Sequence, residues 1–392
     1  MHDSKGKNNT DTLIRVANIL EEGKLGGPQM RVARIACKLN SDVDTIVILP
    51  KENSERFRKS LEGCGTRYKA INLTRLTKEF SVLLRYVLFS LGEVISLARY
   101  LNKEKFDLVH ISGGAWQIKG LLASKLARKK VVWHLNDTNT PLPVKIAFKL
   151  LSKLPDYYIF SSRRTKEYYF PLMRDKKIEN SIITPPVDTS HFLPSYTSQF
   201  SEELKEKYKG KKVIGTVANI NPIKNIEMFL RVASVVSQQV DDVIFVIVGM
   251  VTKNQNSYFR RVTTLKENLN LDNIVFVGAS DDVRSYFKLF DLYLCTSVEE
   301  SGPMTLWEAM SMQCCVVSTD VGDAKDYVKI GSSGEVVDVN DFKGMAEKVV
   351  SLLENLEKRV MCSKKARNIA IEKLDISVCA NKHLKVYQQL SI

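Results

Sequence analysis

The chain has 392 residues, 44% of them hydrophobic, and its 58 Lys and Arg against 44 Asp and Glu give a net charge of +14. This apolar content excludes an intrinsically disordered chain, and contents of 19 Gly and 11 Pro exclude a collagen-like or low-complexity sequence. Because single hydrophobic cores stop growing at about 250 to 300 residues, the length predicts two domains.

The excess of positive charge lies in the first half of the chain. Residues 1–200 contain 33 basic and 19 acidic residues, whereas residues 201–392 contain 25 of each. A basic domain attracts anionic ligands, so acidic lipid head groups or a phosphorylated acceptor are expected partners. Nucleic acid would suit the same charge, but no recognised nucleic-acid motif is visible and we expect no such partner.

Short β-branched runs alternate with helical patterns along the chain, which is typical of βαβ units and parallel sheets. In the first half we predict helices that include 29–39 and 118–127, and strands at 13–20, 45–49, 108–111, 131–135, 157–160 and 182–185. Residues 196–210 are polar and rich in Ser, Lys and Glu, so we interpret them as a linker.

After the linker the pattern restarts. We predict strands at 213–218, 243–248, 274–277, 292–295 and 316–318, and helices at 226–237, 258–269, 282–290, 303–312, 341–353, 357–373 and 377–390. The predicted fold is α/β, with two Rossmann-like domains facing a central cleft. These domains would span residues 1–195 and 211–375, and a last helix at 376–392 would bridge back to the first domain.

The sequence also indicates a compartment. No apolar signal-peptide core precedes Leu13, and the seven cysteines include no Cys-x-x-Cys pair, so we expect a reducing, cytoplasmic location. The most apolar stretch, residues 80–101, contains Arg85, Glu93 and Arg99 and is too polar to span a membrane. Its helical spacing is typical of packed core. A helix resting on anionic lipid is the alternative, which would place the protein peripherally on the inner face of the membrane.

Ligands of open α/β sheets bind beyond the carboxyl ends of strands, so we look for chemistry in the loops that follow strands. Gly26 and Gly27 lie between a predicted strand and a predicted helix. There the backbone can approach a ligand and the helix N-terminus favours an anion. A plain flexible turn is the alternative, because neither a dinucleotide fingerprint nor a Walker sequence is present.

Asn219 and Lys224 lie in the loop after the predicted strand 213–218. A lysine at this edge is a point charge suited to a phosphate, although a lysine in a loop is more often simply solvated.

The loop after strand 292–295 carries Glu300, and Glu308 follows inside a helix that begins near Pro303. Carboxylates accept paired hydroxyl hydrogen bonds, which suits a ribose or a sugar ring. Surface capping by the two glutamates is the alternative. The first amides of the helix would form an anion site without a metal. They belong to Met304, Thr305 and Leu306.

His134 ends an apolar strand, where a lone histidine is more often a hydrogen-bonded core residue than a catalyst. The run Asp42-Val43-Asp44 resembles a metal-binding carboxylate pair but precedes its strand, so it would face away from the cleft. We therefore interpret it as a turn and expect no metal site.

The second half resembles the donor domain of glycosyltransferase family 4, whose signature is Glu-x7-Glu followed by Ala-Met. Glu300, Glu308 and Ala309-Met310 match this signature, and the similarity extends over most of residues 211–330. The first half resembles the family more loosely. This resemblance implies a GT-B fold, with an acceptor-binding first domain and a nucleotide-sugar-binding second domain.

The resemblance also implies roles for the matched residues. Lys224 would neutralise the donor diphosphate, Glu308 would hold the ribose, Glu300 would hold the transferred sugar, and His134 would contact that sugar near the reacting carbon. The implied catalytic residues are Lys224, Glu300 and His134. The implied donor-binding residues are Gly26, Gly27, Asn219, Lys224, Gly249, Gly302, Met304, Thr305, Leu306 and Glu308.

By the same resemblance the protein would be a retaining, metal-independent hexosyltransferase without a cofactor. It would move a sugar from a UDP- or GDP-sugar to a glycan or lipid-linked acceptor in cell-surface polysaccharide or lipid-linked glycan biosynthesis. The sequence departs from the family at Asn219, where Arg is common, at Asn225 and Gln313, where Gly is common, and at Cys315, where Pro is common. The loss of the Arg leaves a catalytically impaired nucleotide-sugar-binding scaffold as the alternative.

Overall fold

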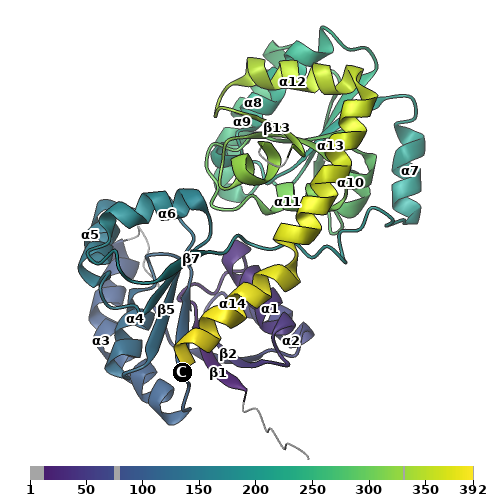
Figure 1. The fold of residues 1–392 in the computed structure, drawn as a ribbon. Helices are drawn as coiled ribbons and strands as arrows, with labels where there is room; N and C mark the ends of the chain where they lie inside the picture. Colours follow the sequence, from purple (N-terminus) through teal and green to yellow (C-terminus); the bar gives the residue numbers. More distant parts are fainter. Residues whose placement is uncertain (1–12, 75–79, 330–331, 392) are drawn as a thin grey trace, which may run out of the picture.

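The computed structural model describes residues 13–74, 80–329 and 332–391, which form two α/β units, one above the other in Figure 1. Each unit has one parallel sheet, in the order β3-β2-β1-β4-β5-β6-β7 in the first and β10-β9-β8-β11-β12-β13 in the second. In both sheets the strand order reverses beside the strand that comes first in the chain, β1 or β8. The predicted fold of two Rossmann-like sheets is confirmed.

The strands of the first sheet are β1 (Ile14–Ile19), β2 (Val43–Pro50), β3 (Arg67–Ile71), β4 (Leu108–Ser112), β5 (Lys130–Leu135), β6 (Tyr157–Phe160) and β7 (Asn180–Ile182). Those of the second are β8 (Lys212–Val217), β9 (Val243–Val248), β10 (Ile274–Gly278), β11 (Leu292–Cys295), β12 (Cys315–Thr319) and β13 (Gly334–Val337). The strand expected at residues 182–185 is shorter and begins earlier than the sequence indicates.

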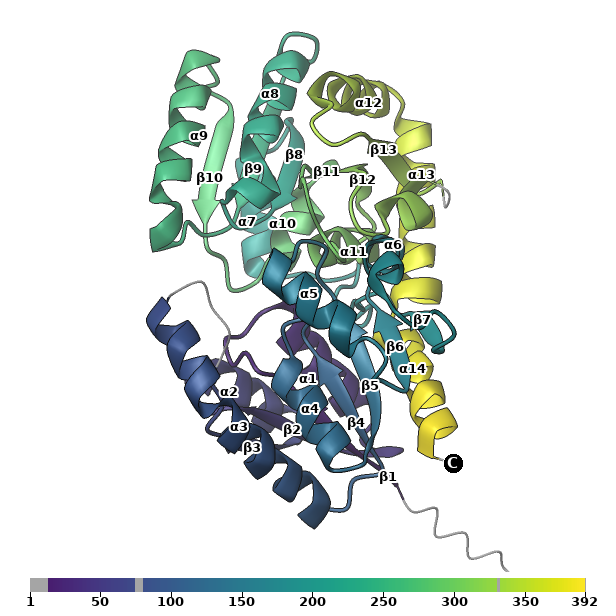
Figure 2. The same cartoon turned by 90° about the vertical axis from the view of Figure 1, so that its left-hand side faces the viewer.

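Helices cover both faces of each sheet (Figure 2). The first unit contains α1 (Gly27–Lys38), α2 (Glu55–Gly63), α3 (Phe80–Lys103), α4 (Ile118–Leu126), α5 (Leu142–Leu151) and α6 (Arg163–Tyr169). The remaining helices are α7 (Gln199–Lys207), α8 (Ile226–Ser237), α9 (Asn256–Asn268), α10 (Arg284–Leu289), α11 (Met304–Ser311), α12 (Phe342–Glu354), α13 (Leu356–Ile369) and α14 (Ile376–Ser391).

The segment interpreted as a linker contains helix α7. Ser198 and Ser201 form a capping box at its start, with the Ser201 amide donating to Ser198 Oγ at 3.1 Å. Leu204 and Tyr208 are buried in the core of the second unit together with Tyr286 of α10. The segment is therefore an amphipathic helix whose few apolar residues are enough to pack it against the second unit.

The chain crosses between the units twice, and the two crossing segments are hydrogen-bonded to each other. The Val187 amide donates to the Leu374 carbonyl at 2.9 Å, and the Ile376 amide donates to the Val187 carbonyl at 3.0 Å. Helix α14 then runs along the first unit (Figure 1), where Cys379 and Tyr387 share a core cluster with Val16 of β1. The last helix thus packs against the first sheet.

Helix α3 has two different halves. Its C-terminal half is packed core, because Leu97 and Leu101 are buried beneath the first sheet. Nearer its start, Leu88, Phe89 and Leu91 expose 67%, 54% and 72% of their surface. None of the described helices combines the length and apolarity that a membrane crossing requires.

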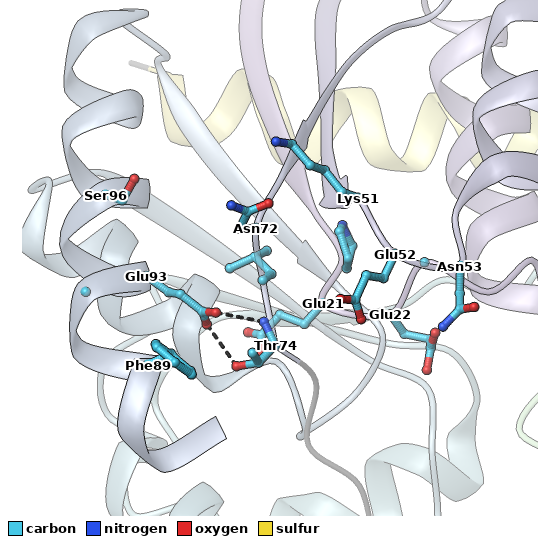
Figure 3. A pocket seen from close by; sticks show the side chains of 14 residues that line it. Glu21, Glu22, Lys51, Glu52, Asn53, Asn72, Thr74, Phe89, Glu93 and Ser96 are labelled. Carbon is cyan, nitrogen blue, oxygen red and sulfur yellow. Dashed lines mark hydrogen bonds between the residues drawn. The ribbon is translucent and has the colours of Figure 1, made fainter. Parts of the chain in front are cut away.

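Because all strands within a sheet are parallel, the loops that follow them collect along one edge of that sheet. In the first unit a cavity of about 660 Å³ lies at this edge, beyond the ends of β1, β2 and β3 (Figure 3). In the second unit the same edge carries the loops after β8 and β11. Four of the candidate site residues lie in these loops, and four more follow in helix α11. The loop residues are Asn219, Lys224, Glu300 and Gly302, and the helix residues are Met304, Thr305, Leu306 and Glu308.

Helix α11 ends in a left-handed residue that is not glycine. Gln313 has φ of +61°, and the amide of Cys314 donates to the Ala309 carbonyl at 2.9 Å, which closes the last turn. The resembled family commonly has glycine here, because a side chain costs free energy in this conformation.

Replacement of Gln313 by glycine should therefore stabilise the protein by about 1 kcal/mol, measured as a higher midpoint of thermal unfolding. Gln239 is exposed, follows helix α8 and is absent from the positive-φ residues of the described chain. Gln239→Gly is the matched control and should be neutral or destabilising. Equal effects of the two substitutions would contradict the backbone explanation.

Candidate functional site

The site of the second unit is built on β8 and β11, which are neighbours where the strand order reverses. After β8 the chain makes a single short turn of helix at Pro222–Lys224, and the Asn221 side chain accepts a hydrogen bond from the Lys224 amide at 3.2 Å. Asn225 follows with φ of +49° and caps α8. Asparagine tolerates this left-handed conformation, which explains how it can replace the glycine common in the resembled family.

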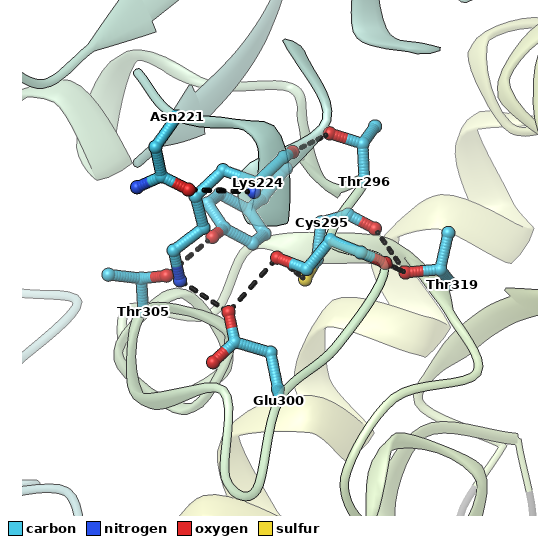
Figure 4. A network of polar contacts seen from close by, with 9 residues as sticks. Asn221, Lys224, Cys295, Thr296, Glu300, Thr305 and Thr319 are labelled. Atoms are coloured by element: carbon cyan, nitrogen blue, oxygen red, sulfur yellow. Dashed lines mark hydrogen bonds and ion pairs between the residues drawn. The ribbon is translucent and has the colours of Figure 1, made fainter. Parts of the chain in front are cut away.

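Lys224 and Glu300 form an ion pair between the two loops (Figure 4). Glu300 Oε1 also accepts from Ser297 Oγ at 3.0 Å, and the Lys224 carbonyl accepts from Thr296 Oγ1 at 2.9 Å. Burial alone would lower the pKa of the Lys224 ammonium, but the charge and hydrogen bond of Glu300 outweigh it and raise the pKa above its usual value. The lysine is therefore a fixed positive charge at the edge of the sheet.

Glu308 lies on α11 and is partly buried. Burial raises its pKa to about 7, and Arg34 of α1 in the first unit opposes part of that rise. No hydrogen bond to this carboxyl occurs among the residues that the structure describes. A partly buried carboxyl with this unused acceptor capacity is suited to hydroxyl groups of a ligand.

The phenol of Tyr293 lies near both glutamates. Its hydroxyl donates to Thr305 Oγ1 at 2.9 Å. Burial, and after it the charges of Cys295, Glu308 and Glu300, raise the pKa of Tyr293 well above its usual value. Both glutamates therefore act on one side chain, and Glu300 is in turn paired with Lys224.

The start of α11 faces the start of α1 in the other unit. A Cβ added to Gly27, the first residue of α1, would lie 3.8 Å from Met304 Sδ, at the first residue of α11. Two helix N-termini with partial positive charge thus approach each other, which favours an anion between them. Leu306 was expected to offer its amide, but this amide donates to the Pro303 carbonyl at 3.0 Å and the side chain is fully buried. Met304 and Thr305 are therefore better placed than Leu306 to offer a backbone amide to an anion.

Two predicted glycines are required for packing. A Cβ on Gly249 would lie 2.0 Å from the Ala218 carbonyl oxygen, and one on Gly302 would lie 2.7 Å from Pro185 of the first unit. Gly26, just before α1, has extended backbone that any residue can adopt. These positions shape the site through close backbone approach.

Asn219 stands where the resembled family commonly has a second cation. Its Oδ1 accepts a hydrogen bond from the Met250 amide at 3.3 Å. The side chain therefore ties the ends of β8 and β9 together and brings no positive charge to the site.

His134 lies in a buried cluster beneath α14. It is 0% exposed, and its Nδ1 lies 3.3 Å from His110 Nε2, whose other nitrogen lies 2.6 Å from the Tyr387 hydroxyl. Its ring also lies beside that of His383, at 5.7 Å between centroids. In this conformation a sugar cannot reach the imidazole, so the burial counts against the expected contact between His134 and the transferred sugar.

Three histidines of this cluster could in principle share a metal ion, because ring nitrogens of His110, His134 and His383 lie within 4.8 Å of one another. Burial lowers the pKa of all three, so the imidazoles are neutral. The charge of Arg31, itself buried, lowers the same pKa values further. A positive charge this close also opposes a metal cation.

Sequence reasoning missed Ser297, Tyr293 and Arg34. Ser297 could have been found, because it lies three residues before Glu300 in the same loop. Tyr293 is the one polar-tipped side chain of an otherwise apolar strand, which is a weaker signal. Arg34 carries no signal, since only the packing of the two units brings it near Glu308.

Comparison with known proteins agrees with this geometry. Two family models match successive parts of the chain: Glycosyltransferase Family 4 over residues 25–191 and Glycosyl transferases group 1 over residues 198–369. UDP-Gal:alpha-D-GlcNAc-diphosphoundecaprenol alpha-1,3-galactosyltransferase of Escherichia coli is 25% identical over 311 residues, which are 75% of this chain and 78% of the relative.

A second relative, N,N'-diacetylbacillosaminyl-diphospho-undecaprenol alpha-1,3-N-acetylgalactosaminyltransferase of Campylobacter jejuni, is 20% identical over 88% of this chain and 91% of its own length. The crystal structure of Anabaena HepE in complex with UDP and glucose has the same fold, with a TM-score of 0.80 at 18% identity over 96% of this chain and 99% of that one. The two models together span both units, and the chain belongs to the family 4 glycosyltransferases, with GT-B architecture.

Proposed function

We propose that this glycosyltransferase moves a sugar, with retention at the anomeric carbon, from a nucleotide-diphosphate donor to a hydroxyl of a glycan or lipid-linked acceptor. The observation that carries the proposal is the ion pair of Lys224 with Glu300, together with Glu308, whose charge acts on the same tyrosine as that of Glu300. Within the described chain the Glu308 carboxyl has no hydrogen bond. A cation, two helix N-termini and two carboxylates match the pyrophosphate, ribose and sugar of such a donor.

The relatives support the nature of donor and acceptor. HepE is described in complex with UDP and glucose, which favours a UDP-sugar as the donor. Both curated relatives are named for an acceptor linked to diphosphoundecaprenol, which favours a lipid-linked acceptor in glycan biosynthesis.

In the proposed reaction Lys224 stabilises the negative charge that develops on the departing phosphate. Its ammonium has three N–H groups, so the hydrogen bond to Glu300 leaves donors for the diphosphate. Lys224 and Ser297 hold Glu300 in place. Its carboxylate can then accept hydrogen bonds from hydroxyls of the transferred sugar. We infer that the acceptor hydroxyl attacks the anomeric carbon from the same face that the phosphate leaves. The departing phosphate takes the proton of that hydroxyl.

Lys224→Ala should lower turnover by at least about a hundredfold, because it removes the strongest cation of the site. The rate of transfer and the slower hydrolysis of the donor by water are measured with the nucleotide-sugar that a thermal-shift panel of UDP- and GDP-sugars selects. Wild-type activity in Lys224→Ala would reject the phosphate role. If the wild-type protein bound a nucleotide-sugar but showed neither transfer nor hydrolysis, the alternative of a catalytically impaired scaffold would be favoured. The replacement of the common Arg by Asn219 is the reason for that alternative.

Glu300→Gln should weaken transfer while leaving the affinity for the free nucleotide unchanged. Glu347→Gln, the same chemical change at an exposed residue of α12, is the control and should leave both transfer and nucleotide binding unchanged. If Glu300→Gln reduced nucleotide binding and transfer equally, its assignment to the sugar would be wrong.

The pKa of Glu308 predicts a pH dependence of donor binding. Below about pH 7 the carboxyl is protonated and loses acceptor capacity, so affinity for UDP-glucose should rise as pH increases from 6 to 8, by up to about tenfold per unit below the pKa. The diphosphate of UDP-glucose does not titrate in this range. Calorimetry should show that Glu308→Gln abolishes the slope and that Glu347→Gln, an exposed change on α12, preserves it. An unchanged slope in Glu308→Gln would exclude the ribose role.

We also propose that the basic first unit contacts anionic membrane through the start of α3, where Leu88 and Leu91 are 67% and 72% exposed. Vesicles containing phosphatidylglycerol should sediment the wild-type protein more strongly than neutral phosphatidylcholine vesicles do. Leu91→Glu should reduce this binding, whereas Leu150→Glu, at a leucine of α5 that is 56% exposed, should not. Equal sedimentation with both lipids and both variants would refute the contact.

A further inference from the structure

The cavity of about 660 Å³ in the first unit has a role that the donor site does not explain. Its lining comes entirely from the first unit, from the loops after β1, β2 and β3 and from helix α3 (Figure 3). Its volume lies within the range of pockets that bind small molecules. It therefore lies at the catalytic edge of the sheet without including any donor-site residue.

The wall of this cavity is acidic although the unit as a whole is basic. Four glutamates line it against one lysine: Glu21, Glu22, Glu52 and Glu93 against Lys51. Facing carboxylates repel a phosphate or carboxylate ligand. Because Lys119 pairs with Glu93, the excess of negative charge comes mainly from Glu22 and Glu52, and it opposes an anionic group in the cavity.

A second lysine, Lys119, lies behind the wall and is fully engaged. It is 1% exposed, forms an ion pair with Glu93 and donates to the Thr74 carbonyl at 2.7 Å. Its ammonium also lies 3.8 Å from the centre of the Tyr86 ring. Lys119 thus fixes Glu93 and Thr74 in place and offers no charge to a ligand. Thr74 and Glu93 are also hydrogen-bonded to each other (Figure 3).

The hydrogen bonding of Glu21 is incomplete. It is 3% exposed, its Oε1 accepts from the Gly120 amide at 2.9 Å, and its Oε2 has no hydrogen-bond partner among the described residues. Such a buried acceptor costs free energy until a donor meets it. Burial raises its pKa to about 7, so near neutral pH the group can accept from or donate to a hydroxyl.

The rest of the lining also suits an uncharged ligand rich in hydroxyls. Asn53, Asn72 and Ser96 supply neutral donors and acceptors, and Phe89, 54% exposed, offers a flat apolar face. No three of these carboxyls lie close enough together to hold a cation, because within the described chain only the three histidines beneath α14 form such a group. Carboxylates, amides and an aromatic ring together are the chemistry that holds a sugar.

The cavity lies next to a smaller one on the donor side. Glu22 lines both this cavity and the smaller one of about 370 Å³, which is bordered by Gly26 and Pro28. The adjacent Gly27 faces Met304 at the start of α11. The larger cavity is therefore separated from the start of α11 by one smaller cavity along the edge of the first sheet.

We propose that this cavity binds the acceptor through an uncharged sugar. Glu21 accepts a hydrogen bond from a hydroxyl of that sugar or donates one to it. Any phosphate of a lipid-linked acceptor would then remain outside the acidic wall. The inference rests on the proposed glycosyl transfer and specifies the acceptor class: a glycan terminus, as opposed to an acid or a phosphorylated sugar.

Saturation-transfer NMR tests the proposal with methyl glycosides of glucose, galactose, mannose and N-acetylglucosamine, each beside the corresponding sugar 6-phosphate. At least one neutral glycoside should bind, and more tightly than its phosphate. Glu21→Gln should weaken that binding about tenfold. Ser96→Phe, which fills the cavity from an exposed position, should abolish it. Glu206→Gln, the same chemical change at an exposed residue of α7, should leave it unchanged.

Tighter binding of the 6-phosphates, absence of binding by all neutral glycosides, or unchanged binding in both cavity variants would overturn the proposal. Binding of UDP-glucose and GDP-mannose is measured in parallel and should be the same in the wild type and the cavity variants. If the wild type binds neither nucleotide-sugar, the proposed donor fails while the glycoside measurements still report on the cavity. The two failures are therefore distinguishable.

Discussion

The parallel direction of the strands is the constraint from which the rest of this structure follows. A parallel sheet collects its strand-to-helix loops on one edge, and the two units present these edges to each other. Contacts such as Thr138 with Glu299 and Gly27 with Met304 join loops of different units that both follow strands. Residues more than a hundred positions apart thereby become parts of one reaction site.

Electrostatics differ between the two sides of that site. On the second unit, Lys224 and the start of α11 supply positive potential for a diphosphate, and Glu300 keeps the lysine charged. On the first unit, the cavity beyond β1, β2 and β3 is lined by four glutamates and one lysine, which opposes an anionic ligand. In the proposed reaction this difference would separate a charged donor from the uncharged end of the acceptor.

Sequence patterns predicted what local periodicity and spacing encode. The two sheets and the grouping of Glu300 with Glu308 after β11 follow from apolar runs and from one spaced motif. Strand β3 was missed because Arg67 and Lys69 lie exposed at the sheet edge, and β13 because it is four residues long and begins with glycine. The cluster that His134 forms with His383 of α14 and the pairing of Lys119 with Glu93 could not be predicted, because they depend on α14 and α3 packing against distant strands.

The double crossing between the units determines how they can move. Because the segments at Val187 and Leu374 to Ile376 are hydrogen-bonded as neighbouring strands, and Thr189 Oγ1 donates to Asp375 at 2.5 Å, the connection is a two-stranded strap. Such a strap resists stretching and sliding but bends readily across its width. The remaining freedom is a hinge-like rotation, which narrows or widens the space between the facing edges while it keeps donor and acceptor loops in register.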